Sequence, residues 1–127
     1  MNGRVSHFEI PADDVSRAQN FYREAFGWGM NPVPEMNYTL VFTVPTDDNG
    51  QPTEPGGING GLMARQEPQR NPVLTIEVDD ISQALERVES LGGKVVADKM
   101  TVGDMGFAAY FTDTEGNVMG LWENAAG

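Results

Sequence analysis

Two stretches of this sequence decide its fold, because they repeat each other. The first reads VSHFEIPADDVSRAQNFYREAFGWG, from Val5 to Gly29, and the second reads VLTIEVDDISQALERVESLGG, from Val73 to Gly93. They align at an offset of 66 positions, which places Asp13-Asp14 over Asp79-Asp80. Self-similarity at a fixed spacing indicates a duplicated structural unit, so both stretches are expected to fold in the same way.

Each stretch predicts a strand followed by a helix. Residues 5–10 and 73–78 are short and rich in β-branched or aromatic residues, as strands are. Asp14 and Asp80 follow them, and each carboxylate can accept from free backbone N–H groups as a helix N-cap. Apolar residues then recur at helical spacing: Val15, Ala18, Tyr22 and Ala25, then Ile81, Ala84 or Leu85, Val88 and Leu91. Gly27 and the pair Gly92-Gly93 are expected to end the helices.

Further strands are expected after each helix. The predicted segments are residues 38–44 and 60–64 in the first copy, then 94–97, 106–112 and 118–123 in the second. Residues 45–57 hold three prolines and three glycines and predict a surface loop. We therefore expect one domain over residues 1–127, with a first module over about 1–66, a linker over about 67–72 and a second module over 73–127.

Composition excludes several classes of protein. The chain has no cysteine, so disulfide scaffolds and thiolate chemistry are excluded. Its start lacks the pattern of a signal peptide, and no apolar run reaches the roughly 20 residues of a membrane span, so a cytoplasmic location is expected. A net charge of −11 disfavours nucleic acid and anionic membranes as partners. Such a charge serves solubility, and it would also favour a cationic ligand.

The sequence resembles the vicinal oxygen chelate superfamily, which includes glyoxalase I, bleomycin-resistance proteins and extradiol dioxygenases. The matching pieces occur in order along nearly the whole chain: HFEIPADD with Ala18, Phe21 and Tyr22, FGW from Phe26, GGINGGLM from Gly56, IEVDDI from Ile76, and FTDTEGNVMGLWE. The resemblance is closest to the branch related to lactoylglutathione lyase. It implies an α+β fold of two tandem βαβββ modules whose curved mixed sheets surround a central cavity. It also implies a homodimer.

The resemblance further implies one metal ligand near the start of each module and one on each module's last strand. It places the first ligand at His7, whose counterpart in the second copy is Val73. The last-strand positions fall on Gly120 and near Gly61, neither of which can ligate. His7 is thus the only ligand-type position retained, and we expect no metal or other cofactor.

Strand alternation nominates three residues for acid–base chemistry. Side chains alternate across a strand, so His7 and Glu9 share one face while Phe8 and Ile10 share the other, expected to lie under the helix. In the second copy Glu77 falls on the corresponding open face, at a different height along its strand. A histidine beside a carboxylate can titrate near neutrality and exchange protons with a substrate.

Aromatic and methionine side chains are candidates for the lining of the ligand cavity. They are Trp28, Tyr38, Phe42, Met63, Phe107, Tyr110 and Trp122. Trp122 alternates onto the same face as Gly120, where a missing side chain leaves room for a ligand. The alternative interpretation of each is an ordinary core residue.

Three functions remain open at this level. The chain could bind a small organic molecule, in particular a flat cation, in its cavity. It could be a metal-independent lyase or isomerase that uses His7 with Glu9 or Glu77. It could also be a metal-dependent lyase of the glyoxalase type or a dioxygenase.

Overall fold

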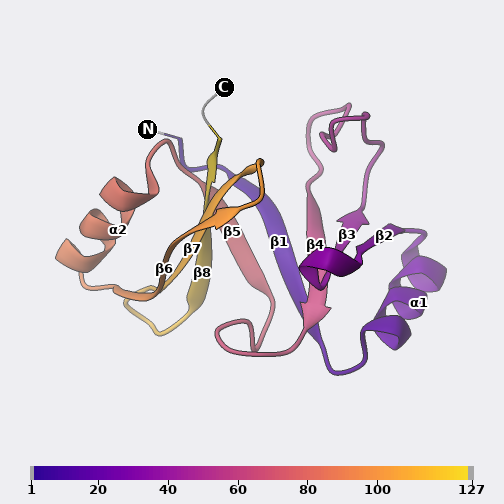
Figure 1. Cartoon of the computed structure of the whole chain (residues 1–127), viewed down its shortest axis with the longest axis horizontal. Helices are drawn as coiled ribbons and strands as arrows, with labels where there is room; N and C mark the ends of the chain where they lie inside the picture. Colours follow the sequence, from indigo (N-terminus) through magenta and orange to yellow (C-terminus); the bar gives the residue numbers. More distant parts are fainter. Residues whose placement is uncertain (1, 126–127) are drawn as a thin grey trace. The chain divides into compact units, whose positions relative to one another are not determined.

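The order of strands and α-helices is the same in the two halves of the chain, as the computed structural model of residues 2–125 shows (Figure 1). The first half contains β1 (Val5–Ala12), α1 (Val15–Phe26), β2 (Gly29–Val33), the 3-10 helix η1 (Pro34–Met36), β3 (Tyr38–Phe42) and β4 (Asn59–Ala64). The second half contains β5 (Val73–Glu77), α2 (Ile81–Ser90), β6 (Lys94–Val102), β7 (Gly106–Thr112) and β8 (Val118–Asn124). The predicted α+β class and the duplicated βαβββ order are confirmed.

The chain forms two compact units, and the border between them lies inside β1. His7–Pro72 make up one unit, while the described residues before His7 group with those from Val73 onward. Two contacts tie the start of the chain to β5: Glu77 N donates to Arg4 O at 2.9 Å, and Asn2 Nδ2 donates to Glu77 Oε2 at 2.7 Å. The first few residues of the chain thus complete the second repeat.

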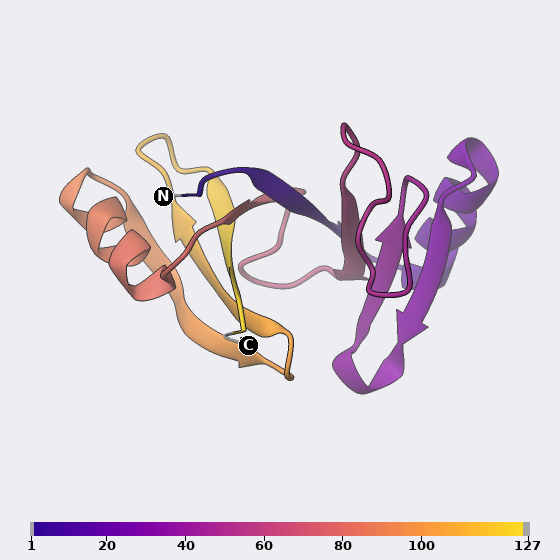
Figure 2. The same ribbon diagram turned by 90° about the horizontal axis from the view of Figure 1, so that it is seen from above.

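In the unit His7–Pro72 the strands lie in the order β2-β3-β4-β1 (Figure 2). β1 pairs with β4 in parallel, and the other pairs are antiparallel. The sequence pattern does not predict β2, because Gly29 and Pro32 are unusual in a strand. Proline lacks a backbone donor and is tolerated in a strand at the sheet edge, and β2 is such a strand.

The second unit repeats this arrangement with the strand order β5-β8-β7-β6. β5 pairs with β8 in parallel, while β8 with β7 and β7 with β6 are antiparallel. β6 continues five residues beyond the predicted end at Ala97, and its pairing with β7 shifts register on either side of that residue. Such irregularities let a strand continue past a position where simple alternation fails.

Both helices begin at the predicted aspartates. Asp14 Oδ1 accepts from Arg17 N at 3.0 Å, and Asp80 Oδ1 accepts from Gln83 N at 3.1 Å, which satisfies one free donor in each first turn. α1 ends at Gly27 in the left-handed conformation, with φ of 74°. α2 ends one residue before the predicted glycine pair, at Leu91, and Gly92 follows with φ of 102°. Among residues 2–125, no helix is both long and apolar enough to cross a membrane.

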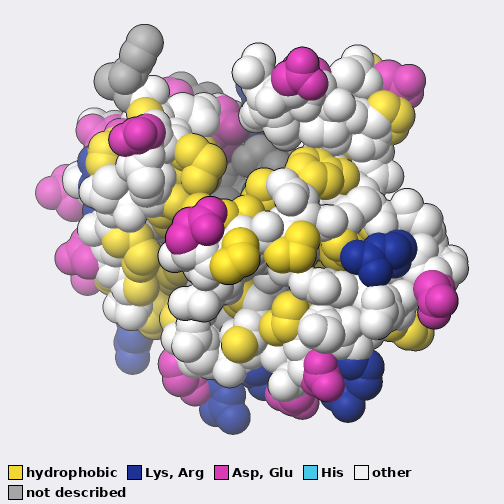
Figure 3. All heavy atoms as spheres, turned by 45° about the vertical axis from the view of Figure 1, so that its right-hand side comes forward, with side chains coloured by type: hydrophobic (Ala, Val, Ile, Leu, Met, Phe, Trp, Pro, Cys, Tyr) yellow, Lys and Arg dark blue, Asp and Glu magenta, His cyan; other side chains and the backbone are white. Residues whose placement is uncertain are grey.

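The two helices differ in how deeply they are buried. α2 contributes Ile81 and Leu85 to a core that continues into the sheet with Ala109, Phe111 and Leu121. α1 has no buried residue, and Phe21 and Phe26 are 60% and 64% exposed. Figure 3, turned to bring this side of the molecule forward, shows hydrophobic side chains at the surface among scattered charged ones. The first helix is therefore held by fewer buried contacts than the second.

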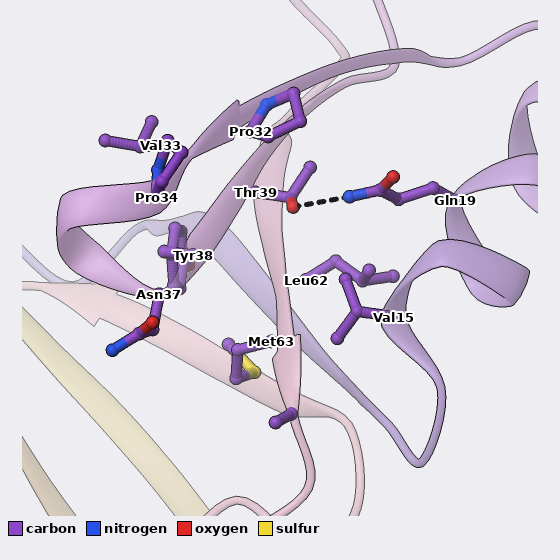
Figure 4. Close-up of a pocket in the computed structure, with 11 residues that line it drawn as sticks. Val15, Gln19, Pro32, Val33, Pro34, Asn37, Tyr38, Thr39, Leu62 and Met63 are labelled. Carbon is purple, nitrogen blue, oxygen red and sulfur yellow. Dashed lines mark hydrogen bonds between the residues drawn. The ribbon is translucent and has the colours of Figure 1, made fainter.

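A cavity of about 280 Å³ lies beside α1 in the first unit (Figure 4). Val15 and Gln19 line it from the helix, opposite Thr39 of β3 and Leu62 of β4. Gln19 Nε2 donates to Thr39 Oγ1 at 2.8 Å, so a side-chain hydrogen bond links helix and sheet here. The packing of α1 against the sheet is therefore incomplete at the start of the helix.

Candidate functional site

Three polar side chains join on the face of the first sheet that lies away from α1. His7 Nε2 lies 2.7 Å from Tyr38 Oη, and Tyr38 Oη donates to Glu9 Oε2 at 3.2 Å. Glu9 is only 8% exposed, while His7 and Tyr38 are half-buried. We call His7, Tyr38 and Glu9 the polar cluster. Buried polar groups of this kind are retained where their hydrogen bonds are satisfied.

Alternation along the strands places the members of the polar cluster together. On β1, His7 and Glu9 point one way, while the ring of Phe8 points the other way, toward Trp28 at 5.9 Å between ring centroids. On β3, Tyr38 follows Asn37, whose φ of 51° closes the 3-10 turn before the strand starts. The next residue, Thr39, turns to the helix side, where it accepts from Gln19.

Gly61 makes room for the phenol ring of Tyr38. Gly61 pairs with Glu9 on β1 and with Leu40 on β3, so it lies at the centre of this face. A Cβ atom added at Gly61 would overlap the ring and hydroxyl oxygen of Tyr38. From the sequence Tyr38 is expected only to line a cavity, whereas in the structure it links His7 to Glu9. The signal that could have revealed this link was the glycine at position 61, which leaves a gap beside a large side chain.

Burial lowers the pKa of His7 from 6.5 to about 4. The ring lies 14° from the plane of the Tyr38 ring and 25° from that of Phe8, with centroids 6.4 and 6.5 Å away. Burial in the protein removes water from the imidazole and so disfavours its charged form. At neutral pH His7 is therefore uncharged, with one nitrogen as a donor and the other as an acceptor.

The second unit carries a related but less polar arrangement. Thr75, Gly120 and Tyr110 stand side by side across β5, β8 and β7. A Cβ atom at Gly120 would lie 3.0 Å from Thr75 Oγ1 and 3.5 Å from Tyr110 Cε1, so the space here is tight but open. Glu77 lies two residues further along β5 and accepts from Asn2. The structure thus joins His7 and Glu9 in the first unit and places the third acid–base candidate, Glu77, in the second.

The seven candidate lining residues divide between the two faces of their sheets. Tyr38, Phe42 and Met63 of the first unit, and Tyr110 and Trp122 of the second, alternate onto the faces that carry Gly61 and Gly120. Trp28 instead stacks on Tyr22 of α1 at 4.9 Å. Phe107 packs against the α2 core, with Lys99 Nζ 4.4 Å above its ring. These two rings thus lie on the helix sides of their sheets, and the ligand contacts of all seven residues stay a prediction.

The residues present do not fit a divalent metal ion. Among residues 2–125, no group of three or more His, Asp or Glu side chains gathers closely enough to hold one. In the first unit His7 and Glu9 already bond to Tyr38, whose phenol takes the space beside Gly61. A divalent metal ion usually needs three or four nitrogen or oxygen ligands that converge on it. Here the Tyr38 phenol occupies the space between His7 and Glu9 into which such ligands would have to converge.

Comparisons with known proteins agree with this fold. A family model described as bleomycin resistance protein-like N-terminal matches residues 4–44. A glyoxylase-like domain-containing protein of Didymella fabae is 34% identical over 122 residues, which cover 92% of this chain and 91% of that protein. The putative glyoxylase CFP32 of Mycobacterium tuberculosis is 30% identical over 127 residues. The match covers 95% of this chain but only 46% of CFP32, so this chain spans about half the length of that relative.

A solved structure supports the same assignment at the level of fold. Methylmalonyl-CoA epimerase from Mycobacterium tuberculosis superimposes with a TM-score of 0.65 over 98% of this chain and 89% of that one, at 18% identity. Sequence identity this low shows that the two proteins share a fold, but it says nothing about whether they share an activity. The Didymella relative, by contrast, matches over nearly the full length of both chains. This chain therefore belongs to the vicinal oxygen chelate superfamily, as one of its glyoxalase-like members.

Proposed function

We propose that this chain binds a small organic molecule, without a metal ion, on the sheet face that carries the polar cluster. The observation that carries the proposal is the hydrogen-bonded set of His7, Tyr38 and Glu9 on a face that α1 does not cover. Ligand sites in proteins combine apolar walls with a few fixed polar groups. Phe42, which is half-buried, supplies apolar surface from β3, and the polar cluster supplies the fixed groups.

The charge of the protein favours a cationic or neutral ligand over an anionic one. The net charge is −11, and Glu9 adds a carboxyl group within the face itself. An aromatic cation would gain from both the negative potential and the ring of Phe42. Binding rather than catalysis fits the low pKa of His7, because a base with a pKa of about 4 accepts protons poorly at neutral pH.

Thermal-shift screening followed by titration calorimetry tests this proposal. A ligand that binds only the folded chain at 100 times its Kd stabilises it by about 2.7 kcal/mol, which raises the melting temperature. Phe42→Ala and His7→Ala should weaken that binding, whereas Phe21→Ala, on the exposed side of α1, should leave it unchanged. If a broad panel of neutral and cationic aromatics never raises the melting temperature, or if Phe21→Ala weakens binding as much as Phe42→Ala, the proposal is wrong.

A second candidate function is metal-independent proton transfer, as in a lyase or isomerase. It is favoured by the continuous hydrogen-bonded path from His7 through Tyr38 to Glu9, along which a proton can move. The putative glyoxylases among its relatives give a reason to test carbonyl compounds with an acidic C–H bond. Turnover that persists in full after His7→Ala and Glu9→Gln would exclude this function, and turnover lost in both with binding retained would support it.

A further inference from the structure

We infer that the polar cluster holds His7 as the tautomer protonated on Nε2, so that Nδ1 offers a lone pair and selects ligands that bring a hydrogen-bond donor. The first part concerns the free protein. The second part rests on the proposed function, because it assumes a ligand at this face.

The protons of the cluster can be assigned one by one. An ionised carboxylate only accepts hydrogen bonds, so at 3.2 Å from Glu9 Oε2 the phenol of Tyr38 must be the donor. A phenol carries a single proton, and that proton is now directed to Glu9. The 2.7 Å contact between Tyr38 Oη and His7 Nε2 therefore needs its proton from the imidazole. The hydrogen bonds run in one direction, from Nε2–H to Oη and from Oη–H to the carboxylate.

The other imidazole nitrogen is left as an acceptor. A neutral imidazole ring has one N–H group, and in this arrangement the contact with Tyr38 places it on Nε2. Within residues 2–125, no hydrogen bond reaches Nδ1, and no fully buried side-chain nitrogen or oxygen lacks a partner. Nδ1 therefore keeps some exposure, and a ligand can reach it.

An acceptor at this place sets the class of ligand. A phenol, alcohol or protonated amine can donate to Nδ1, whereas an ether offers only its own lone pairs and a carboxylate repels both Nδ1 and Glu9. Sites built around a hydrogen bond discriminate strongly against an analogue that lacks the group, because the polar atom of the protein then loses its partner. The proposed ligand is thus an O–H or N–H donor of neutral or positive charge.

The opposite arrangement pairs a protonated Glu9 with the other imidazole tautomer. Glu9 would then donate to Tyr38, Tyr38 would donate to Nε2, and the imidazole proton would sit on Nδ1. The site would in that case offer a donor and favour carboxylates and ethers. The two arrangements predict opposite ligand preferences.

Nitrogen-15 NMR of the uniformly labelled chain decides between them, because His7 is the one histidine of the sequence and its signals need no assignment. At pH 7 we expect a protonated Nε2 whose N–H exchanges slowly, with Nδ1 unprotonated. Tyr38→Phe removes the acceptor and should expose the Nε2 proton to rapid exchange. Tyr22→Phe, which removes a hydroxyl from the ring stacked on Trp28, should change nothing. An Nδ1–H tautomer, or an Nε2 proton equally protected in Tyr38→Phe, overturns the inference.

Matched probes test the ligand half. By ligand-observed NMR, phenol should bind at least about fivefold more tightly than anisole, and benzoate should bind least. His7→Phe should bring the phenol-to-anisole ratio close to one. Equal binding of phenol and anisole, or preferred binding of benzoate, overturns the donor preference. If the Nε2–H tautomer is found and none of the probes binds at millimolar concentration, the proposed function fails together with this ligand half, while the tautomer itself stands.

Discussion

In each repeat a glycine of the last strand lies beside a tyrosine of the neighbouring strand, but the tyrosines occupy different positions. Tyr110 pairs directly with Gly120, whereas Tyr38 lies two residues before Leu40, the partner of Gly61. In the first repeat, the Tyr38 phenol covers Gly61 and bonds to His7 and Glu9. In the second, Tyr110 stands beside Gly120 with Thr75 as the polar neighbour, and the same space stays partly open. The helices differ in burial. α2 places two residues in the core of its repeat, whereas α1 has no buried residue.

This contrast shows how a duplicated unit can divide its tasks. The second repeat keeps a continuous apolar core, in which Ile81, Leu85 and Leu121 are almost fully buried. The first repeat instead holds the polar cluster on its sheet, and its helix packs over a cavity. Packing quality sets stability and polar groups set recognition, so the two properties are expected to respond to different mutations.

The largest expected difference between the repeats is in the free energy of unfolding lost when the first residue of each helix is shortened. Ile81→Ala should lower the free energy of unfolding by about 3 kcal/mol, because it empties space in a closed core. Val15→Ala, the matching position in α1, should cost less than about 1 kcal/mol, because Val15 is half-buried and already borders a cavity. Urea unfolding measures both values. Equal costs would show that α1 is as well anchored as α2.

The next largest difference is expected between alanine substitutions at the two last-strand glycines. Gly61→Ala should cost about 2 kcal/mol, because its methyl group displaces the Tyr38 ring and breaks the polar cluster. Gly120→Ala should cost less than about 1 kcal/mol, because its nearest neighbour, Thr75 Oγ1, needs to move by only a few tenths of an ångström. Urea unfolding and the His7 ring signals report the two effects. A Gly120→Ala cost equal to that of Gly61→Ala would contradict the difference in space.

Acid should destabilise the chain through the first repeat. The pKa of His7 is lowered to about 4 in the folded chain, so between about pH 6.5 and 4 the unfolded chain binds more protons there. Stability is therefore lost as the pH falls through this window, by up to about 1.4 kcal/mol per pH unit from this group, and the loss stops below about pH 4.

His7→Gln separates this effect from the titration of carboxylates. The variant should show a flatter dependence of unfolding free energy on pH between 6.5 and 4 than the parent chain. The second repeat has Val73 at the matching position, so this position contributes no pH dependence to the free energy of unfolding. Parallel curves for the variant and the parent would mean that His7 titrates normally.

The smallest expected effects concern a feature that the repeats share. Asp14→Ala and Asp80→Ala should each cost about 1 kcal/mol, because each carboxylate caps its helix through one backbone N–H group. In α2, Glu123 Oε1 also accepts from Ile81 N at 2.9 Å, so this helix keeps a partner for its first turn. Hydrogen exchange should therefore show more fraying at the start of α1 in Asp14→Ala than at the start of α2 in Asp80→Ala.

The duplicated fold could be predicted from the sequence because its signals are local. Aspartate caps, helical spacing and glycine ends each depend on a few neighbouring residues, and alternation placed His7 and Glu9 on one face. β2 was missed because Pro32 is acceptable only at a sheet edge, and edge position depends on the order of strands. The link through Tyr38 depends on two long-range registers, Glu9 with Gly61 and Leu40 with Gly61, which no local pattern contains. The side of the sheet on which Trp28 and Phe107 lie could not be predicted either, because residue type does not tell one face of a sheet from the other.

The overlap between position 61 and Tyr38 also sets the order in which this surface can change during evolution. A side chain at position 61 fits without displacing the phenol only after position 38 has become small. A carboxylate or imidazole at position 61 thus needs two substitutions in a fixed sequence, and the first of them already removes the link between His7 and Glu9. At position 120 no such order applies, because small side chains need only minor adjustment. New chemistry on the last strands of this protein is therefore easier to reach in the second repeat than in the first.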